Sequence, residues 1–147
     1  MSSTRHTTGR FRYADWTEEP ADSAGTADAH GAAGTVPRLA GATVTNTFSG
    51  GIEAAGTVCR YTIAYLGPAE GTFTGLELLS GSLDGRKGGF VLAESGTFDA
   101  DGTHCTFEVV PGSGTGELAG LRGTGHFFSP HSPESVAYAF DYELPGA

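Results

Sequence analysis

The sequence is poor in basic residues and in long apolar runs, and each shortage excludes a class of function. Lys and Arg together number 8 against 17 Asp and Glu, so the formal charge is −9. Such a surface repels phosphate backbones, which argues against nucleic acid or anionic membranes as partners. No apolar run approaches the roughly 20 residues that a membrane-spanning helix needs. Residues 1–10 hold no apolar stretch typical of a signal peptide, so we expect a cytoplasmic protein.

Cysteine and histidine are too few or too scattered to predict a disulfide framework or a metal site. In a cytoplasmic chain Cys59 and Cys105 are expected to be free thiols, and such residues are commonly small buried hydrophobes. Residues 114–119 read GTGELA, but further glycines and strands follow where a dinucleotide-binding fingerprint needs a helix. There is no G-x-S-x-G nucleophile motif. We therefore expect no cofactor and no metal, because the five histidines lack metal-site spacing: His6, His30, His104, His126 and His131.

Glycine is the abundant residue, at 24, and it divides the chain into short segments of alternating apolar and polar residues. Alternation with this spacing is typical of strands joined by tight turns, and Asp84-Gly85 is the strongest hairpin signal. A meander of short strands removes its exposed edges by closing. We predict one all-β domain over 1–147, an eight-stranded antiparallel β-barrel. The strands are expected at 7–16, 42–51, 52–68, 71–85, 86–102, 103–114, 121–128 and 135–146.

Two segments lack the strand pattern. Residues 1–6 are expected to be a frayed tail. Residues 20–37 are small, acidic and without periodicity, which indicates a long flexible loop after the first strand. Such a loop is either an idle insertion or a lid over the mouth of the barrel.

The informative residues are the polar ones that fall on apolar faces. Alternation places Glu77, Glu94 and Asn46 beside buried positions, and a buried carboxyl group is costly unless it is hydrogen-bonded or neutralised. Glu77 and Glu94 lie on consecutive strands, so they are candidates to share a proton. Tyr61 and Tyr65 fall on the same faces and could donate hydrogen bonds to a ligand.

Each of these placements has an alternative. A β-bulge between Gly88 and Gly96 would turn Glu94 to solvent, and Glu77 could lie on the outer face with Leu76 and Leu78 inside. The tyrosines could be ordinary core aromatics whose hydroxyl groups reach the end of the barrel.

Four segments carry a resemblance to a known family: FRYADWTEEP at 11–20, the run from AYLGPAEG to SGTF at 64–98, VVPGSGTGELAGLRGTGHF at 109–127, and YAFDYELP at 138–145. They resemble a family of small bacterial proteins known only as a domain of unknown function. Its fold is similar to the allene oxide cyclase and dirigent-type β-barrels. The resemblance implies a cyclase or isomerase in bacterial secondary metabolism, which would hold a small hydrophobic metabolite in the lumen. No catalytic residue is transferred from those barrels.

Three functions remain open at this point. The first is the cyclase or isomerase, with Glu77, Glu94 and Tyr65 as candidate catalytic residues. The second is a non-catalytic barrel that binds a small apolar molecule. The third is a structural or stress protein whose core is filled by its own side chains. A homo-oligomer is open in all three. The candidate ligand-binding residues are Asn46, Cys59, Tyr61, Phe73, Phe90, Cys105, Phe107, Tyr138, Phe140 and Tyr142.

Overall fold

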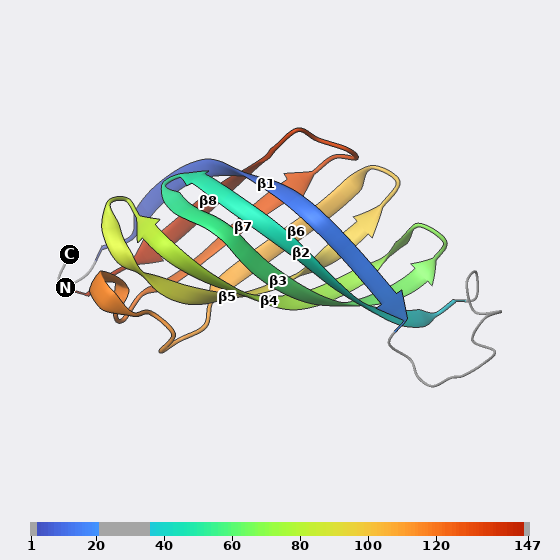
Figure 1. Ribbon diagram of the computed structural model, residues 1–147, viewed down its shortest axis with the longest axis horizontal. Helices are drawn as coiled ribbons and strands as arrows, with labels where there is room; N and C mark the ends of the chain where they lie inside the picture. The colour runs from blue at the N-terminus through green and yellow to red at the C-terminus, as the bar shows by residue number, and fades with distance from the viewer. Residues whose placement is uncertain (1–2, 21–35, 146–147) are drawn as a thin grey trace.

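Eight antiparallel strands form one closed barrel in which each strand pairs with its neighbours in sequence and β1 pairs with β8 (Figure 1). The structure is a computed structural model that describes residues 3–20 and 36–145. The predicted all-β barrel is confirmed. The strands are β1 (Arg5–Pro20), β2 (Arg38–Gly50), β3 (Ile52–Gly67), β4 (Glu70–Leu83), β5 (Arg86–Asp99), β6 (Gly102–Val109), β7 (Arg122–Ser129) and β8 (Val136–Glu143). A 3-10 turn, η2 (Gly116–Leu118), lies between β6 and β7.

The turn chemistry of the sequence accounts for the hairpins. Leu83 pairs with Arg86, so Asp84 and Gly85 form the two-residue turn between β4 and β5. Both residues have positive φ, 48° and 88°, as the tight turn that suits the twist of a hairpin requires. The predicted hairpin at this position is therefore confirmed.

The first strand differs from the prediction at both ends. It begins at Arg5 and not at Thr7, because the backbone from Arg5 to Phe11 pairs with β8 and closes the barrel. It also continues past Trp16 to Pro20 by pairing with β2. The expected tail is thus shorter than 1–6, and most of the loop expected at 20–37 lies outside the described residues.

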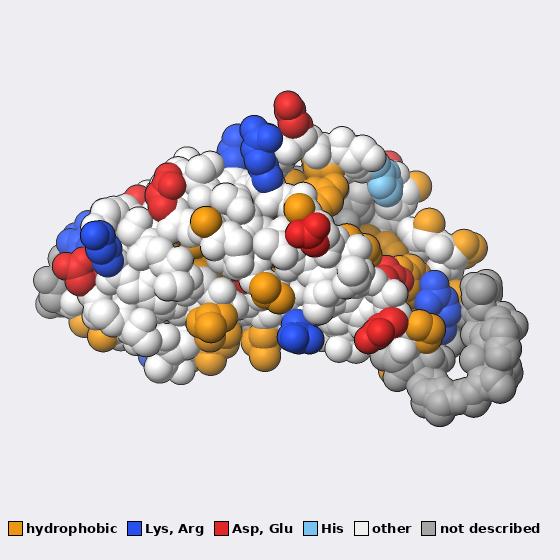
Figure 2. Space-filling model, viewed as in Figure 1, with side chains coloured by type: hydrophobic (Ala, Val, Ile, Leu, Met, Phe, Trp, Pro, Cys, Tyr) orange, Lys and Arg blue, Asp and Glu red, His pale blue; other side chains and the backbone are white. Residues whose placement is uncertain are grey.

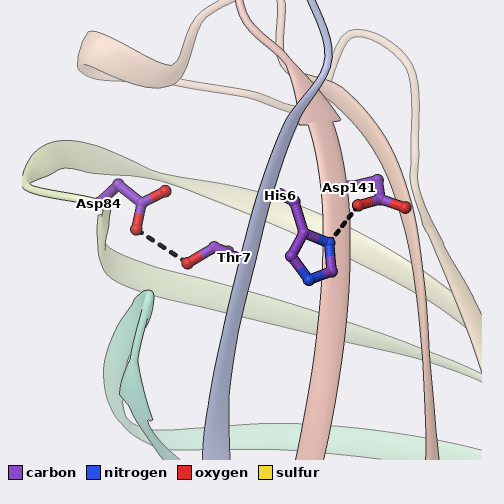
Figure 3. Close-up of polar contacts among 4 residues, drawn as sticks. All are labelled: His6, Thr7, Asp84 and Asp141. Atoms are coloured by element: carbon purple, nitrogen blue, oxygen red, sulfur yellow. Dashed lines mark hydrogen bonds and ion pairs between the residues drawn. The ribbon is translucent and has the colours of Figure 1, made fainter.

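The two ends of the barrel are packed differently. One end, near the two termini in Figure 1, is solid: η2 covers it, and Leu118 and Leu121 have no exposed surface. Polar contacts join the strands there, since Asp84 accepts hydrogen bonds from Thr7 at 3.0 Å and from Tyr142 at 2.6 Å. Figure 3 shows the first of these contacts beside His6 and Asp141, which link β1 to β8 on the outer surface.

The other end is open because β1 leaves its neighbour. β1 pairs with β8 only as far as Phe11, and from Arg12 to Pro20 its pairing in the described structure is with β2 alone. β6, β7 and β8 are also short, at 8 residues each, against 13 to 16 for β1 to β5. The wall of the barrel is therefore incomplete between β1 and β8 at this end.

Within the described residues, no helix is long and apolar enough to cross a membrane.

Candidate functional site

A cavity of about 320 Å³ occupies the open end of the barrel. Figure 2 shows apolar side chains gathered in a hollow toward this end of the molecule. Its lining includes residues of β1 and the end of β7 with the residues that follow it, 129–132. Its walls are mainly aromatic: Phe11, Tyr13, Trp16, Phe48, Tyr61, Tyr65, Phe73, Phe98, Phe107, Phe127 and Tyr138.

Glu77 and Glu94 both face this cavity and are almost fully buried, with 1% and 4% of their surfaces exposed. The pairing of β4 with β5 runs from Gly71 to Leu83 without a register shift, so no bulge turns Glu94 outward. Leu76 and Leu78 lie on the outer face instead, 57% and 65% exposed. Two carboxyl groups inside and two leucines outside are the reverse of the usual pattern, which favours a functional role for this part of the sheet.

Glu77 is held by hydrogen-bond donors from two neighbouring strands. Asn46 on β2 donates from Nδ2 to Glu77 Oε2 at 2.8 Å, and the hydroxyl group of Thr57 on β3 donates to the same oxygen. Cys59 is directly opposite Glu77 in the sheet. These contacts hold the Glu77 side chain in one position beneath the cavity.

Glu94 receives the hydroxyl hydrogen of Tyr61, with 2.7 Å between the oxygens, although Tyr61 is on β3 and Glu94 is two strands away on β5. Gly75 makes this contact possible, because it pairs with Tyr61 on one side and with Glu94 on the other. A Cβ at Gly75 would lie 2.6 Å from the Tyr61 ring. Because Gly75 has no side chain, the phenol ring of Tyr61 can lie across β4 at this position.

The environment of Glu94 favours its neutral form. Burial raises its pKa well above the ordinary value, and the nearby Glu77 raises it further, whereas the hydrogen bonds from Tyr61 and Cys105 act in the opposite direction. Burial, with the charge of Glu94, also raises the pKa of Tyr61. The cavity therefore holds two buried carboxyl groups, of which Glu94 has a raised pKa.

The cysteines lie behind this pair. Cys59 and Cys105 are both buried free thiols, as the sequence predicted. Burial raises the pKa of each, with Glu94 adding to the effect, so both stay protonated. Donor atoms of Cys59, Glu77 and Glu94 lie within 4.8 Å of one another, a distance that could hold a metal ion. The set contains no histidine and its thiol resists deprotonation, so the expectation of no metal stays a prediction.

Two mouth residues, Trp16 and Glu18, were missed by the sequence analysis. The register of β1 shifts between Ala14 and Thr17, so Asp15 and Trp16 together oppose one residue of β2. Asp15 has a φ of 58°, and the extra residue changes which side chains of β1 face inward. Trp16 lines the cavity in consequence, 6.1 Å from the Tyr61 ring centre. The bulge is marked by the shift in strand pairing and by the positive φ of Asp15. Neither feature can be read from a single sequence.

Tyr65 is at the mouth, not beside the carboxyl pair. Its hydroxyl group donates to Glu18 at 2.6 Å, and the Arg38 guanidinium lies 4.0 Å from its ring centre. Burial and the hydrogen bond to Glu18 raise the pKa of Tyr65 to about 12. Trp16 also donates to Glu18, at 3.1 Å, so this carboxylate joins two aromatic side chains at the rim.

The predicted site residues fall into three groups. Glu77, Glu94 and Tyr65 line the cavity with five of the candidate ligand-binding residues. Those five are Asn46, Tyr61, Phe73, Phe107 and Tyr138. Phe90, Phe140 and Tyr142 belong to the main buried core cluster and do not line the cavity. Cys59 and Cys105 are buried next to the carboxyl pair without lining the cavity.

The fold and the cavity define a small closed β-barrel with an acidic, aromatic-walled pocket at one end. The chain belongs to the DUF3224 family, described as "Protein of unknown function (DUF3224)", which matches residues 7–142. It is similar to a crystal structure, at 1.84 Å resolution, of a protein with unknown function from the DUF3224 family from Shewanella oneidensis MR-1. That similarity has 28% identity and a TM-score of 0.74, and it covers 97% of this chain and 98% of the other. No curated protein matches the sequence. The resemblance to allene oxide cyclase and dirigent barrels stays a prediction.

Proposed function

We propose that this protein binds a small, mainly apolar molecule in the cavity and holds its polar group against Glu77 and Glu94. The cavity volume of about 320 Å³ carries the proposal. Pockets that bind small molecules begin at about this size and combine apolar walls with a few polar groups. A filled-core structural protein would have no need for two carboxyl groups beneath an open mouth.

Ligand binding can be tested with a neutral fluorophore, N-phenyl-1-naphthylamine. We expect saturable enhancement of its emission at one site per chain, with quenching of Trp16, the single tryptophan. Trp16→Ala should weaken binding because it removes part of the mouth. Leu78→Ala, on the exposed outer face, is the matched control and should bind as the wild type does.

Native mass spectrometry of protein purified from a cell lysate then addresses the natural ligand. An apolar small molecule bound at one per chain, released on denaturation, would support the proposal and supply its chemical skeleton. No saturable fluorophore binding and no retained molecule would contradict it. The same spectrum would report whether the chain forms the homo-oligomer left open by the sequence.

A second candidate is the cyclase or isomerase, favoured by two adjacent buried carboxyl groups, one of which has a raised pKa. In such a pair Glu77 would remove a proton from the substrate, while protonated Glu94, which accepts the hydroxyl hydrogen of Tyr61, would donate a hydrogen bond to a developing oxyanion. Because Tyr65 is at the mouth and not beside the carboxyl pair, we propose a role for it in binding and not in proton transfer.

A simple substrate tests this chemistry. Conversion of 3-cyclohexen-1-one to the conjugated 2-cyclohexen-1-one needs removal of a proton at C2 and return of a proton at C4, and ultraviolet absorbance follows it. We expect Glu77→Gln and Glu94→Gln to abolish any turnover, whereas Glu108→Gln on the outer face should retain it. Equal turnover in all four proteins would remove the acid–base role.

A further inference from the structure

The polar groups at the base of the cavity include several hydrogen-bond acceptors with free lone pairs. Glu77 and Glu94 contribute carboxyl oxygens, and Tyr61 already donates its hydroxyl hydrogen to Glu94. The Asn46 amide donates from Nδ2 to Glu77, which leaves its carbonyl oxygen for other use. A ligand that carries hydrogen-bond donors can therefore bind to these free acceptor atoms.

Asn46 gives independent support. Its side chain lines the cavity and only 4% of its surface is exposed. Among the described residues, its Oδ1 is the buried side-chain oxygen or nitrogen that has no hydrogen-bond partner. Buried acceptors are normally paired, so an unpaired one beside a cavity indicates a donor that comes from a ligand. Exchanging the oxygen and nitrogen positions of the Asn46 amide would still leave one atom unpaired, since Nδ2 would then lose the Glu77 carboxyl oxygen as its acceptor.

The charged residues around the cavity also favour a ligand that carries a positive charge. Of the described residues that line the cavity, none is Lys or Arg, whereas Glu77, Glu94 and Asp99 carry carboxyl groups. The Arg38 guanidinium stacks on Tyr65 at the mouth and is not part of the lining. The chain as a whole has a formal charge of −9, which attracts cations and repels anions.

The walls are also suited to a cation. Trp16 and Tyr61 lie 6.1 Å apart, and Phe73 meets Tyr61 edge to face at 5.2 Å. The faces of such rings attract ammonium groups, while their area contacts the apolar part of the same molecule.

We propose that the ligand is a small apolar amine in its protonated form, with the ammonium group bound by Glu77, Glu94 and the free carbonyl oxygen of Asn46. This inference rests on the proposed function, that the cavity binds a small molecule. It adds the chemical class, and it makes the carboxyl pair an anchor for a cation.

Three probes with one skeleton and different head groups test the class: 4-phenylbutylamine, 4-phenylbutan-1-ol and 4-phenylbutanoate. Titration calorimetry at neutral pH gives each affinity, and Trp16 fluorescence provides a second readout. We expect the amine to bind about tenfold or more tightly than the alcohol, because hydrogen bonds to charged groups are the stronger ones. The carboxylate should bind most weakly, since Glu77 and Asp99 repel it.

Isosteric variants locate the anchor. Glu77→Gln should lower the amine affinity by a larger factor than the alcohol affinity and so remove most of the preference for the amine, because Gln keeps the shape but lacks the charge. Glu94→Gln should retain more of the preference, since the pKa of Glu94 is raised in the free protein. Glu108→Gln, on the outer face, is the control and should keep the full preference.

The outcomes separate this inference from the function on which it rests. If the alcohol or the carboxylate binds the wild type as tightly as the amine does, the amine class is wrong and ligand binding stands. If none of the probes, including the neutral fluorophore, binds, both proposals fail. If the preference for the amine persists in both Glu77→Gln and Glu94→Gln, the carboxyl pair is not the anchor and the inference is overturned. The wild-type comparison decides the class even if one variant does not fold.

Discussion

At the scale of single residues, the site depends on the missing side chain of Gly75 as well as on its polar residues. The contact between Tyr61 and Glu94 crosses β4 at Gly75, where no side chain intervenes. The neighbouring Glu77 is buried between donors from β2 and β3. These residues are close in space and distant in sequence. Each contact can be tested by a single substitution.

Gly75→Ala should destabilise the protein by about 1–3 kcal/mol, as overpacking does, and displace the Tyr61 ring. The new Cβ would lie 2.6 Å from both the ring and the backbone oxygen of Arg60, and the backbone cannot move aside easily. Urea unfolding measures the loss. Gly41→Ala is the matched control, since its nearest neighbour would be at an ordinary 3.9 Å. Equal stability of both variants would contradict the packing argument.

Glu94→Gln should remove a pH dependence of stability. Because the pKa of Glu94 is raised in the folded protein, the native state keeps a proton that the unfolded chain loses above about 4.5. The free energy of unfolding is therefore highest below this pH and falls as pH rises through the native pKa, by up to about tenfold in the folding equilibrium per pH unit.

Urea unfolding between pH 4 and pH 8 measures this slope. The Gln variant cannot ionise, so its stability should fall less steeply over that range than that of the wild type. Glu108→Gln, exposed on β6, should keep the wild-type slope. An unchanged slope in Glu94→Gln would mean that Glu94 is not the group responsible.

At the scale of secondary-structure elements, β1 has two functions. Its first half, up to Phe11, closes the barrel against β8, and its second half extends beyond β8 to form the rim of the cavity. The bulge at Asp15 and Trp16 separates the two halves and directs Trp16 and Glu18 to the mouth. A regular strand would have directed them outward, because side chains alternate.

Asp15→Val should therefore destabilise the protein by about 1–2 kcal/mol, the cost of a β-branched residue in a left-handed conformation. Since Asp15 has a φ of 58°, the variant should also shift the emission of Trp16 as the rim rearranges. Ala14→Val is the control, because Ala14 is exposed in the regular part of the same strand. Unfolding curves and fluorescence spectra of both would show whether the bulge is needed.

At the scale of the whole molecule, a closely packed region and a cavity lie at opposite ends of the barrel. Leu118 and Leu121 are fully buried at the end where η2 lies, and the open end contains the cavity and the carboxyl pair. A rigid end supports a site that would otherwise be held by unpaired strand edges. Substitutions at the two ends should therefore differ in kind.

Leu118→Ala, at the solid end, should lower the free energy of unfolding by about 2–5 kcal/mol and leave fluorophore affinity unchanged. Leu118 has no exposed surface, so its truncation creates a buried void. Trp16→Ala, which removes a side chain that is 48% exposed, should cost less stability and more affinity. Loss of binding in Leu118→Ala under conditions where it remains folded would show that the ends are coupled.

The sequence by itself determined the all-β class, the strand number and most turns, because these depend on local alternation and on residues such as Asp84 and Gly85 that favour one turn geometry. It also proposed Glu77 and Glu94 as inward residues, but alternation could not exclude a bulge in β5 or an inverted β4. Only the unbroken pairing of these strands, across the closed barrel, decided that both carboxyl groups face the cavity.

The tertiary structure alone decided which aromatic residues fill the barrel and which surround a cavity. Phe140 and Phe107 have the same character in sequence, yet only Phe107 lines the pocket, because depth along the barrel depends on strand stagger and not on parity. The bulge at Asp15 and the passage of Tyr61 over Gly75 are likewise properties of strand pairing. Alternation reports which face a side chain occupies, and the closed sheet determines what that face encloses.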